Sequence, residues 1–238
     1  MEKTVSEAIN YRRSVRKFDP NKEIDVNIVK KCIKNGVLAP TSSNLQLWEF
    51  YHITNEDLLK KISKICFNQP AASTAKQIVI TVVRKDLWKL RSNQNIEFFN
   101  LNKKELSKKQ YDSTQKYYKI AIPFVYRDFL GILSIFKYII TNILGYFRVM
   151  YRQVKASDTR IVAHKSAALA SQNFMISMAG FGYDTCPMEG FDSLKIKHLL
   201  KLNKNSEINM IIGCGIRLEE GVYGERFRIP FEEVYFEK

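Results

Sequence analysis

The chain has 238 residues, of which 45% are hydrophobic and 12% are aromatic. This composition is typical of a globular protein and excludes a disordered or low-complexity chain. A chain of this length forms one large domain or at most two small ones, and it buries enough surface to fold without a disulfide or a structural metal.

The cysteines and histidines are scattered along the chain. The four cysteines are separated by at least 28 residues, so none has CxxC spacing, and there are only three histidines. We therefore expect no metal site. Widely spaced free thiols indicate a reducing compartment, and the N-terminal sequence has no apolar segment of the kind found in signal peptides. We expect a cytoplasmic protein.

The net charge of +14 is concentrated in the middle of the chain. Residues 84–165 contain 17 Lys and Arg against 6 Asp and Glu, a net charge of +11. This segment lacks a zinc finger, an RNP motif or a recognition-helix pattern, so we expect no nucleic-acid partner. Attraction for anionic cofactors, substrates or membrane surfaces stays open.

The first third of the chain alternates helical and strand patterns. Apolar residues at helical spacing predict helices over residues 3–13 and 26–38, and Asp25 is in position to cap the second. Runs rich in β-branched and aromatic residues predict strands over Trp48–Ile53 and Gln77–Val83. The second run is apolar except for Gln77 and Thr81, which indicates a strand buried on both faces.

Residues 86–155 differ in composition from the rest of the chain. Residues 129–147 are apolar enough to suggest a membrane span, but a polar stripe that includes a lysine runs along one helical face, which a span would not keep. We predict an amphipathic helix or helical pair whose apolar face carries Ile132, Phe136, Ile139, Ile140, Ile143 and Phe147. We expect this face to pack against protein, either the body of the chain or a partner subunit, with a lipid surface as the alternative.

The last third predicts one long helix and one strand. Residues 159–180 form an Ala-rich helical pattern that ends in glycines, and residues 208–213 read as another buried strand. Strands alternating with helices indicate an α/β or α+β fold with one central sheet.

Two arginine-containing motifs could bind an anion. In RRSVRKFD, an extended backbone would project Arg12, Ser14 and Arg16 to one side, and two guanidinium groups around a hydroxyl suit a phosphate. A basic surface turn explains the same residues. Near the C-terminus, Arg226 and Arg228 of RFRIPFEEV are also two residues apart.

Two further motifs suit a polar ring. The loop motif APTSSNLQLW offers small hydrogen-bonding side chains, which could recognise a heterocycle or simply cap a helix: Thr41, Ser42, Asn44 and Gln46. The motif CPMEGF follows the glycines of the long helix. Its tight turn would let a flat ring approach the backbone closely.

Together and in this order, RRSVRKFD, APTSSNLQLW, PMEGFD and RFRIPFEEV resemble the motifs of the nitroreductase family of FMN-dependent oxidoreductases. The resemblance covers about residues 4–85 and 156–236 and leaves the basic middle segment unmatched. It implies an α+β fold with a central, mostly antiparallel sheet flanked by helices. It also implies an interlocked homodimer that shares two FMN sites. We expect a single domain over residues 1–238, with a helical insertion at about 86–155.

The resemblance also implies roles for individual residues. Arg12 and Ser14, flanking Arg13, would hold the FMN phosphate together with Arg228, while Arg16 and Arg226 would face the pyrimidine edge of the flavin. The partner subunit would contribute Thr41, Ser42 and Asn44, with Gln46 in the same loop. Asn68 matches a position where the family often has a flavin-contacting polar side chain. The ring face opposite the substrate would be lined by Pro187, Met188, Glu189 and Gly190.

The activity implied is electron transfer from NADH or NADPH, through bound FMN, to a nitroaromatic, quinone or similar small acceptor by a ping-pong mechanism. Because the cofactor carries this reaction, we expect no catalytic side chain. The alternative is a flavin-holding protein that docks on an anionic membrane surface through residues 86–155.

Overall fold

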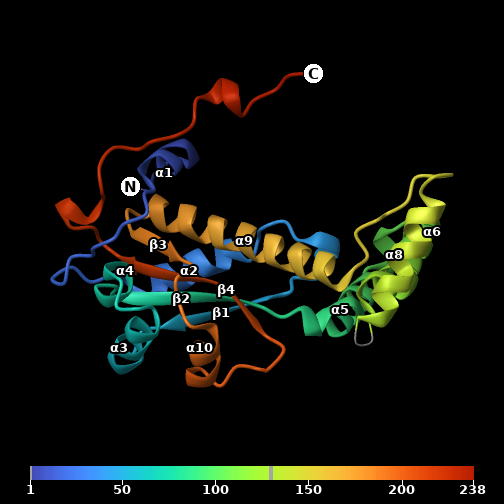
Figure 1. Cartoon of the computed structure of the whole chain (residues 1–238), viewed down its shortest axis with the longest axis horizontal. Coiled ribbons are helices and arrows are strands. Elements are labelled where there is room, and N and C mark those ends of the chain that lie inside the picture. The colour runs from blue at the N-terminus through green and yellow to red at the C-terminus, as the bar shows by residue number, and fades with distance from the viewer. Residues whose placement is uncertain (1, 129–130) are drawn as a thin grey trace.

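The computed structural model describes residues 2–128 and 131–238. Its centre is a four-stranded antiparallel sheet in the order β1-β2-β4-β3 (Figure 1), formed by β1 (Trp48–Ile53), β2 (Gln77–Val83), β4 (Glu207–Gly215) and β3 (Asp184–Met188). The predicted bounds of β1 and β2 are confirmed, and β4 extends the predicted strand at both ends. The strand β3 was not predicted. The predicted α+β class with a central antiparallel sheet is confirmed.

Helices cover both faces of the sheet (Figure 1). One face carries α9 (Ala156–Gly180), with α2 (Val26–Gly36) and α1 (Val5–Tyr11) packed against it. The other face carries α3 (Glu56–Ile65), α4 (Pro70–Ser73) and α10 (Ser193–Leu199).

The strand β2 is buried along its whole length, as its sequence predicts. Ile78 and Ile80 pack into the core under α3 and α10, whereas Val79 packs into the core under α2 and α9. On the α9 side the hydroxyls of Thr81 and Ser171 form a buried 2.8 Å hydrogen bond. Both faces of the sheet therefore belong to the interior.

The helix ends follow their capping residues. Asp25 caps α2 as predicted, because its carboxylate accepts a hydrogen bond from the Asn27 N–H at 2.7 Å. The long helix α9 starts three residues before the prediction and ends at Gly180 as predicted. Helix α1 is shorter than predicted because the chain becomes extended at Arg12, where ψ is 122°.

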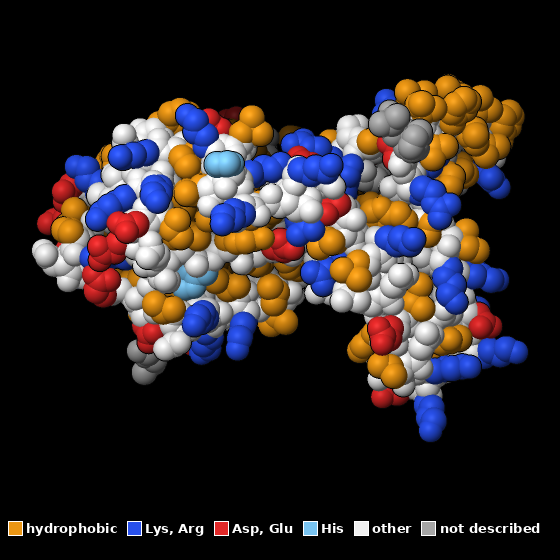
Figure 2. Space-filling view, turned by 90° about the horizontal axis from the view of Figure 1, so that it is seen from below, with side chains coloured by type: hydrophobic (Ala, Val, Ile, Leu, Met, Phe, Trp, Pro, Cys, Tyr) orange, Lys and Arg blue, Asp and Glu red, His pale blue; other side chains and the backbone are white. Residues whose placement is uncertain are grey.

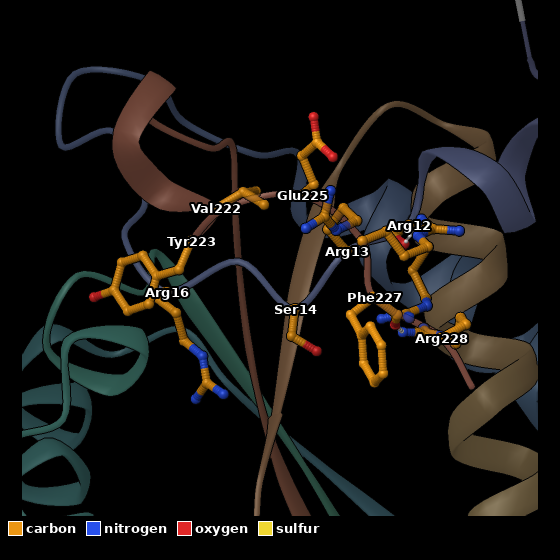
Figure 3. Close-up of a pocket in the computed structure, with 10 residues that line it drawn as sticks. Arg12, Arg13, Ser14, Arg16, Val222, Tyr223, Glu225, Phe227 and Arg228 are labelled. Carbon is orange, nitrogen blue, oxygen red and sulfur yellow. Dashed lines mark hydrogen bonds between the residues drawn. The ribbon is translucent and has the colours of Figure 1, made fainter. Parts of the chain in front are cut away.

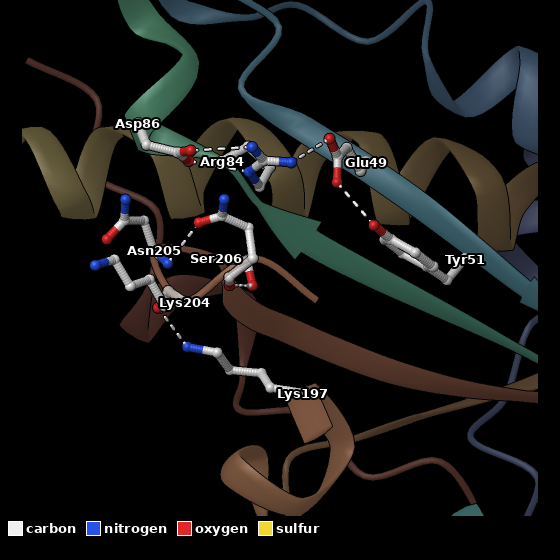
Figure 4. A network of polar contacts seen from close by, with 9 residues as sticks. Glu49, Tyr51, Arg84, Asp86, Lys197, Lys204, Asn205 and Ser206 are labelled. Carbon is white, nitrogen blue, oxygen red and sulfur yellow. Dashed lines mark hydrogen bonds and ion pairs between the residues drawn. The ribbon is translucent and has the colours of Figure 1, made fainter. Parts of the chain in front are cut away.

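The middle segment forms a group of helices at one end of the molecule, beyond the sheet (Figure 1). It contains α5 (Trp88–Leu101), α6 (Lys108–Lys116), a π-helical turn η4 (Tyr117–Ala121), α7 (Ile122–Tyr126) and α8 (Ile132–Leu144). Arg84 holds the start of this middle segment in place, because its guanidinium binds the carboxylates of Glu49 and Asp86 at 2.6 and 2.9 Å (Figure 4). Of the helices described, none combines the length and the apolarity needed to cross a membrane.

Helix α8 is amphipathic as predicted, but the body of the chain, one of the two protein surfaces expected to cover its apolar face, leaves that face largely exposed. Ser134 and Thr141 of the polar stripe are buried, whereas Ile132, Phe136 and Phe147 are 52%, 61% and 85% exposed. Residues 129 and 130, where the predicted segment begins, lie outside the described residues. A partner subunit and a lipid surface are the predicted alternatives that are left for this face.

Candidate functional site

Segments from opposite ends of the chain meet around a cavity of about 250 Å³ (Figure 3). The structure brings together all of the arginines and the serine predicted from the first and last motifs. Its lining includes Arg12, Arg13, Ser14, Arg16, Arg226 and Arg228. Tyr223 and Phe227 also line the cavity and were not predicted.

The N-terminal segment is held against the sheet in an extended conformation. Ser14 pairs with Thr185 of β3 in a parallel bridge, and the Val15 N–H donates to the Thr185 carbonyl at 3.2 Å. Val15 is fully buried, whereas Ser14 and Arg16 on either side of it line the cavity. Ser14, Val15 and Arg16 therefore alternate as predicted, whereas Arg13, which alternation would point away from Arg12 and Ser14, also lines the cavity.

Two glycines allow this close packing. A Cβ atom at Gly215 would lie 2.7 Å from the ring of Phe18, and a Cβ at Gly221 would lie 2.4 Å from the carbonyl oxygen of Lys17. Arg16 also donates its N–H to the Gly221 carbonyl at 2.6 Å. Glycine at 215 and 221 thus lets the arginine segment lie directly on the end of β4 and on the C-terminal segment.

Five arginines and the carboxylate of Glu225 line the cavity, which leaves it with a net positive charge. Within residues 2–128 and 131–238, none of the five cavity arginines forms an ion pair with a carboxylate. Burial lowers the pKa of Arg12, and the nearby charges of Arg226 and Arg228 lower it further. Like charges held together in a half-buried cavity favour the binding of an anion, which relieves their repulsion.

The cavity arginines also hold the two segments together. Arg226 donates to the carbonyl oxygens of Asn10 and Arg12 at 2.7 and 2.8 Å, and Arg13 donates to the Gly224 carbonyl at 3.0 Å. The guanidinium of Arg226 is therefore engaged at the end of α1. Its assignment to a ring edge stays a prediction.

The strand β3 lies beside the arginine segment, since Thr185 pairs with Ser14. Burial raises the pKa of the Cys186 thiol in β3, and the nearby positive charges of Arg16 and Arg12 lower it. Of the four residues predicted to line a ring, Pro187 and Met188 are the last residues of β3, and Glu189 and Gly190 follow it. Met188 is buried and Glu189 is exposed.

The predicted residue Asn68 lies beside this turn. Its neighbour Gln69, which was not predicted, donates from Nε2 to the Gly190 carbonyl at 2.7 Å. Phe67 and Asn68 have φ values of 56° and 50°, in the left-handed region. Non-glycine residues adopt this conformation only where the surrounding structure holds them, and such positions are frequent at functional sites.

The loop containing Thr41, Ser42, Asn44 and Gln46 does not line the arginine cavity. It borders a separate hollow of about 290 Å³ beside α5. Three of its residues, Ser43, Asn44 and Gln46, have φ values of 55°, 49° and 48°. In this chain alone, the predicted loop and the predicted arginines are therefore two separate sites.

Residues of the middle segment hold the loop in place, and the sequence analysis did not predict them. Asn44 and Asn95 exchange hydrogen bonds of 2.8 and 3.0 Å, and the hydroxyls of Ser43 and Tyr117 lie 2.7 Å apart. An apolar hollow of about 400 Å³ opens beside Ser42, and aromatic side chains of Tyr117, Phe124, Tyr126 and Tyr151 contribute to its lining.

Comparisons with known proteins agree with this fold. The nitroreductase family model matches residues 9–216. Putative NAD(P)H nitroreductase SH0546 of Staphylococcus haemolyticus is 27% identical over 240 residues, which covers 98% of this chain and 97% of that protein. The structure of ydfN of Bacillus subtilis superposes with a TM-score of 0.74 at 22% identity and 98% coverage of both chains.

A second solved structure, "Putative nitroreductase in complex with FMN" from Exiguobacterium sibiricum, superposes with a TM-score of 0.69 at 20% identity. The match covers 99% of this chain and 98% of that one. The family model spans the sheet, the loop at 41–46 and the turn after β3. The chain therefore belongs to the nitroreductase family.

Proposed function

We propose that this protein is an FMN-dependent oxidoreductase that passes electrons from NADH or NADPH to a small acceptor such as a nitroaromatic or a quinone. The observation that carries the proposal is the cavity lined by five arginines, none of which forms an ion pair within the described residues, on a segment that pairs with β3. Membership of the nitroreductase family and the FMN complex of the Exiguobacterium sibiricum protein support it.

The residues present fit the phosphate end of FMN. Arg12 and Arg228 would bind phosphate oxygens through charge-assisted hydrogen bonds, and the exposed hydroxyl of Ser14 would donate a further one (Figure 3). A phosphate dianion would also remove the repulsion that lowers the pKa of Arg12. Arginine side chains make up half of the cavity lining, which favours a strongly charged anion such as a phosphate.

The residues around the turn fit the ring. Arg16 would place a fixed positive charge beside the polar ring edge, which favours a ring that gains negative charge on reduction. The backbone of Glu189 and Gly190 would approach the ring, with Gln69 holding the Gly190 carbonyl in place at 2.7 Å. When bound, FMN supplies the hydride chemistry, so no nucleophile or general base is needed from the protein.

We propose that the active unit is a homodimer. A cavity of 250 Å³ lies below the range of roughly 300–1,000 Å³ that encloses a whole small-molecule ligand, so another surface must cover the rest of the flavin. The loop at Thr41, Ser42, Asn44 and Gln46 lies outside this cavity and would come from the partner subunit. The C-terminal segment after Gly224 is almost wholly exposed, including Phe231 and Phe236 at 64% and 73%, and would be covered by the same partner.

The apolar hollow beside Ser42 is our candidate for the acceptor pocket. Its volume of about 400 Å³ suits a molecule of one or two rings, and the rings of Phe124 and Tyr126 offer stacking surfaces. Since the loop at Ser42 would face the partner's flavin, this hollow would lie next to the reducible ring in the dimer.

Absorption spectroscopy tests the function. Purified protein reconstituted with FMN should show the flavin spectrum, lose its absorbance when NADH or NADPH is added without oxygen, and regain it when a quinone or a nitroaromatic is added. A protein that binds no FMN after reconstitution would contradict the proposal. A flavin that is bound but not reduced by either nucleotide would contradict the enzymatic part alone.

A further inference from the structure

We propose that the apolar face of α8, together with the loop that follows it, docks on the surface of a bilayer that contains anionic lipid. The proposed docking surface consists of Ile135, Phe136, Ile139, Ile140 and Ile143 of α8 and of Tyr146, Phe147 and Val149 in the loop. The helical residues are 49–61% exposed, and the loop residues are 85–102% exposed. This inference does not depend on the proposed flavin chemistry.

The orientation of α8 is fixed by contacts on its polar side. Thr141 is 1% exposed, and its hydroxyl donates to the Lys137 carbonyl at 2.8 Å. The Lys137 ammonium donates to the Arg127 carbonyl, and the Lys155 ammonium lies 3.7 Å from the centroid of the Tyr138 ring. The Thr141 hydrogen bond lies within the helix, but turning the apolar face inward would expose Thr141 and break the contacts of Lys137 and Lys155. The chain therefore presents this face outward.

Charged side chains stabilise both ends of α8. The Ser134 N–H in the first turn donates to the Asp128 carboxylate at 3.0 Å. At the other end, Arg152 donates to Asn142 Oδ1 at 2.9 Å and to the Gly145 carbonyl at 2.7 Å. An anion at the N-terminus and a cation at the C-terminus both complement the helix dipole. The helix is therefore held firmly, while its apolar face stays largely exposed among the residues that the structure describes.

The docking surface forms a continuous patch at the end of the molecule farthest from the sheet. Figure 2 shows apolar side chains gathered there, with Lys and Arg at the margins. Large exposed apolar patches on soluble proteins mark sites of interaction. Because α8 has only 13 residues, it is too short to cross a bilayer and would lie along its surface.

The charge around the patch favours an anionic lipid surface over a second copy of the chain. Residues 119–155 contain 6 Lys and Arg against 1 Asp, and this acid, Asp128, is bonded to the start of α8. Two copies meeting face to face would bring these cations together. Lipid phosphates would instead pair with them.

The loop after α8 alternates apolar and cationic side chains in the way that interfacial segments do. Arg148 stands between Phe147 and Val149, all three are exposed, and Val149 is the most exposed large apolar side chain described. Phe147 and Val149 would enter the headgroup region while Arg148 reaches lipid phosphates. Each such cation strengthens binding to an anionic surface by about fivefold.

Vesicle co-sedimentation tests the proposal with the full-length protein. We expect binding to vesicles of phosphatidylglycerol and phosphatidylcholine that weakens with added salt, and much weaker binding to phosphatidylcholine alone. Ile140→Ser with Phe147→Ser should lower the partition coefficient roughly 10- to 100-fold, because two apolar side chains no longer leave water. Arg148→Glu should weaken binding to the anionic vesicles only.

The matched control is Leu194→Ser on α10, which removes an equally exposed apolar side chain, 74% exposed, outside the patch. It should bind vesicles like the wild type. Unchanged circular dichroism and FMN content in all variants would show that folding and the proposed cofactor site are intact. Equal binding of the double variant and the wild type would overturn the proposal. A wild-type dimer that the double variant converts to monomer in sedimentation would overturn it too, in favour of a contact between copies.

Discussion

Arg217 hydrogen-bonds to the buried carboxylate of Asp184 through both its backbone N–H and its guanidinium. The Arg217 N–H and Nε donate to the two carboxylate oxygens at 2.8 and 2.9 Å. The guanidinium also lies 4.3 Å from the centroid of the Tyr11 ring and donates to the Tyr11 carbonyl at 3.2 Å. The pair thus ties the end of α1, from which the arginine segment emerges, to β3 and to the end of β4.

Asp184→Asn should destabilise the fold by about 2–4 kcal/mol, because it leaves the partly buried Arg217 without its countercharge. Asp184 is 2% exposed, so water cannot replace the lost contact. Urea unfolding of the FMN-free protein measures the change. The exposed Asp57→Asn serves as control and should change the free energy of unfolding by less than about 0.5 kcal/mol. A similar loss in both variants would contradict the structural role of the pair.

Arg228→Ala should weaken FMN binding by roughly 10- to 100-fold, because it removes a charge-assisted contact to the phosphate. In the part of the chain that the structure describes, the one hydrogen bond of the Arg228 guanidinium is to the neighbouring Phe227 carbonyl, so its loss should leave the stability of the FMN-free protein unchanged. Fluorescence titration with FMN and urea unfolding separate the two effects. Equal FMN affinity in the variant and the wild type would show that the phosphate assignment is wrong.

Arg226→Ala should behave differently. This arginine binds the carbonyls of Asn10 and Arg12, so the variant should lose stability without FMN as well as affinity for it. If Arg226 also faces the ring edge, the reduction potential of the bound flavin should fall, since a nearby cation is lost. A variant with wild-type stability and potential would contradict both roles.

Asn44→Ala should weaken FMN binding by about 1–3 kcal/mol if this side chain binds the partner's flavin, because a buried polar group of the cofactor loses its hydrogen bond. Asn95→Ala is the informative comparison, since it removes the support of Asn44 without removing Asn44 itself. Titration with FMN and analytical ultracentrifugation test both variants. A wild-type monomer with tightly bound FMN would rule out the shared site.

The ion pairs of Glu207 should contribute stability that depends on pH. Burial raises the pKa of Glu207, but hydrogen bonds from Arg160 and His164 outweigh it and keep the pKa below the ordinary value of 4.5. A lowered pKa means that the stabilisation is present above pH 4.5 and is lost as the pH falls through the pKa of the folded state. The stability difference between the wild type and Glu207→Gln should therefore shrink below pH 4.5. The exposed Glu232→Gln should show no such trend.

The sequence by itself determined three strands of the sheet, β1, β2 and β4, and the helices α1, α2 and α9. The mostly apolar run of β2 indicated a buried strand, and Asp25 marked the start of α2, because local side-chain pattern and capping chemistry decide these features. The alternation in RRSVRKFD predicted that Arg12, Ser14 and Arg16 lie together, and the structure adds Arg13 to the same cavity.

Only the tertiary structure determined which residues of distant segments are in contact. No local pattern links Arg217 to Asp184 or Gln69 to Gly190, because these contacts join segments 33 and 121 residues apart and exist only once the sheet has formed. The strand β3 escaped prediction since it is short and contains Pro187. Helical periodicity revealed that α8 is amphipathic, but which face turns outward depends on Lys137, Lys155 and Arg152 meeting partners elsewhere in the fold.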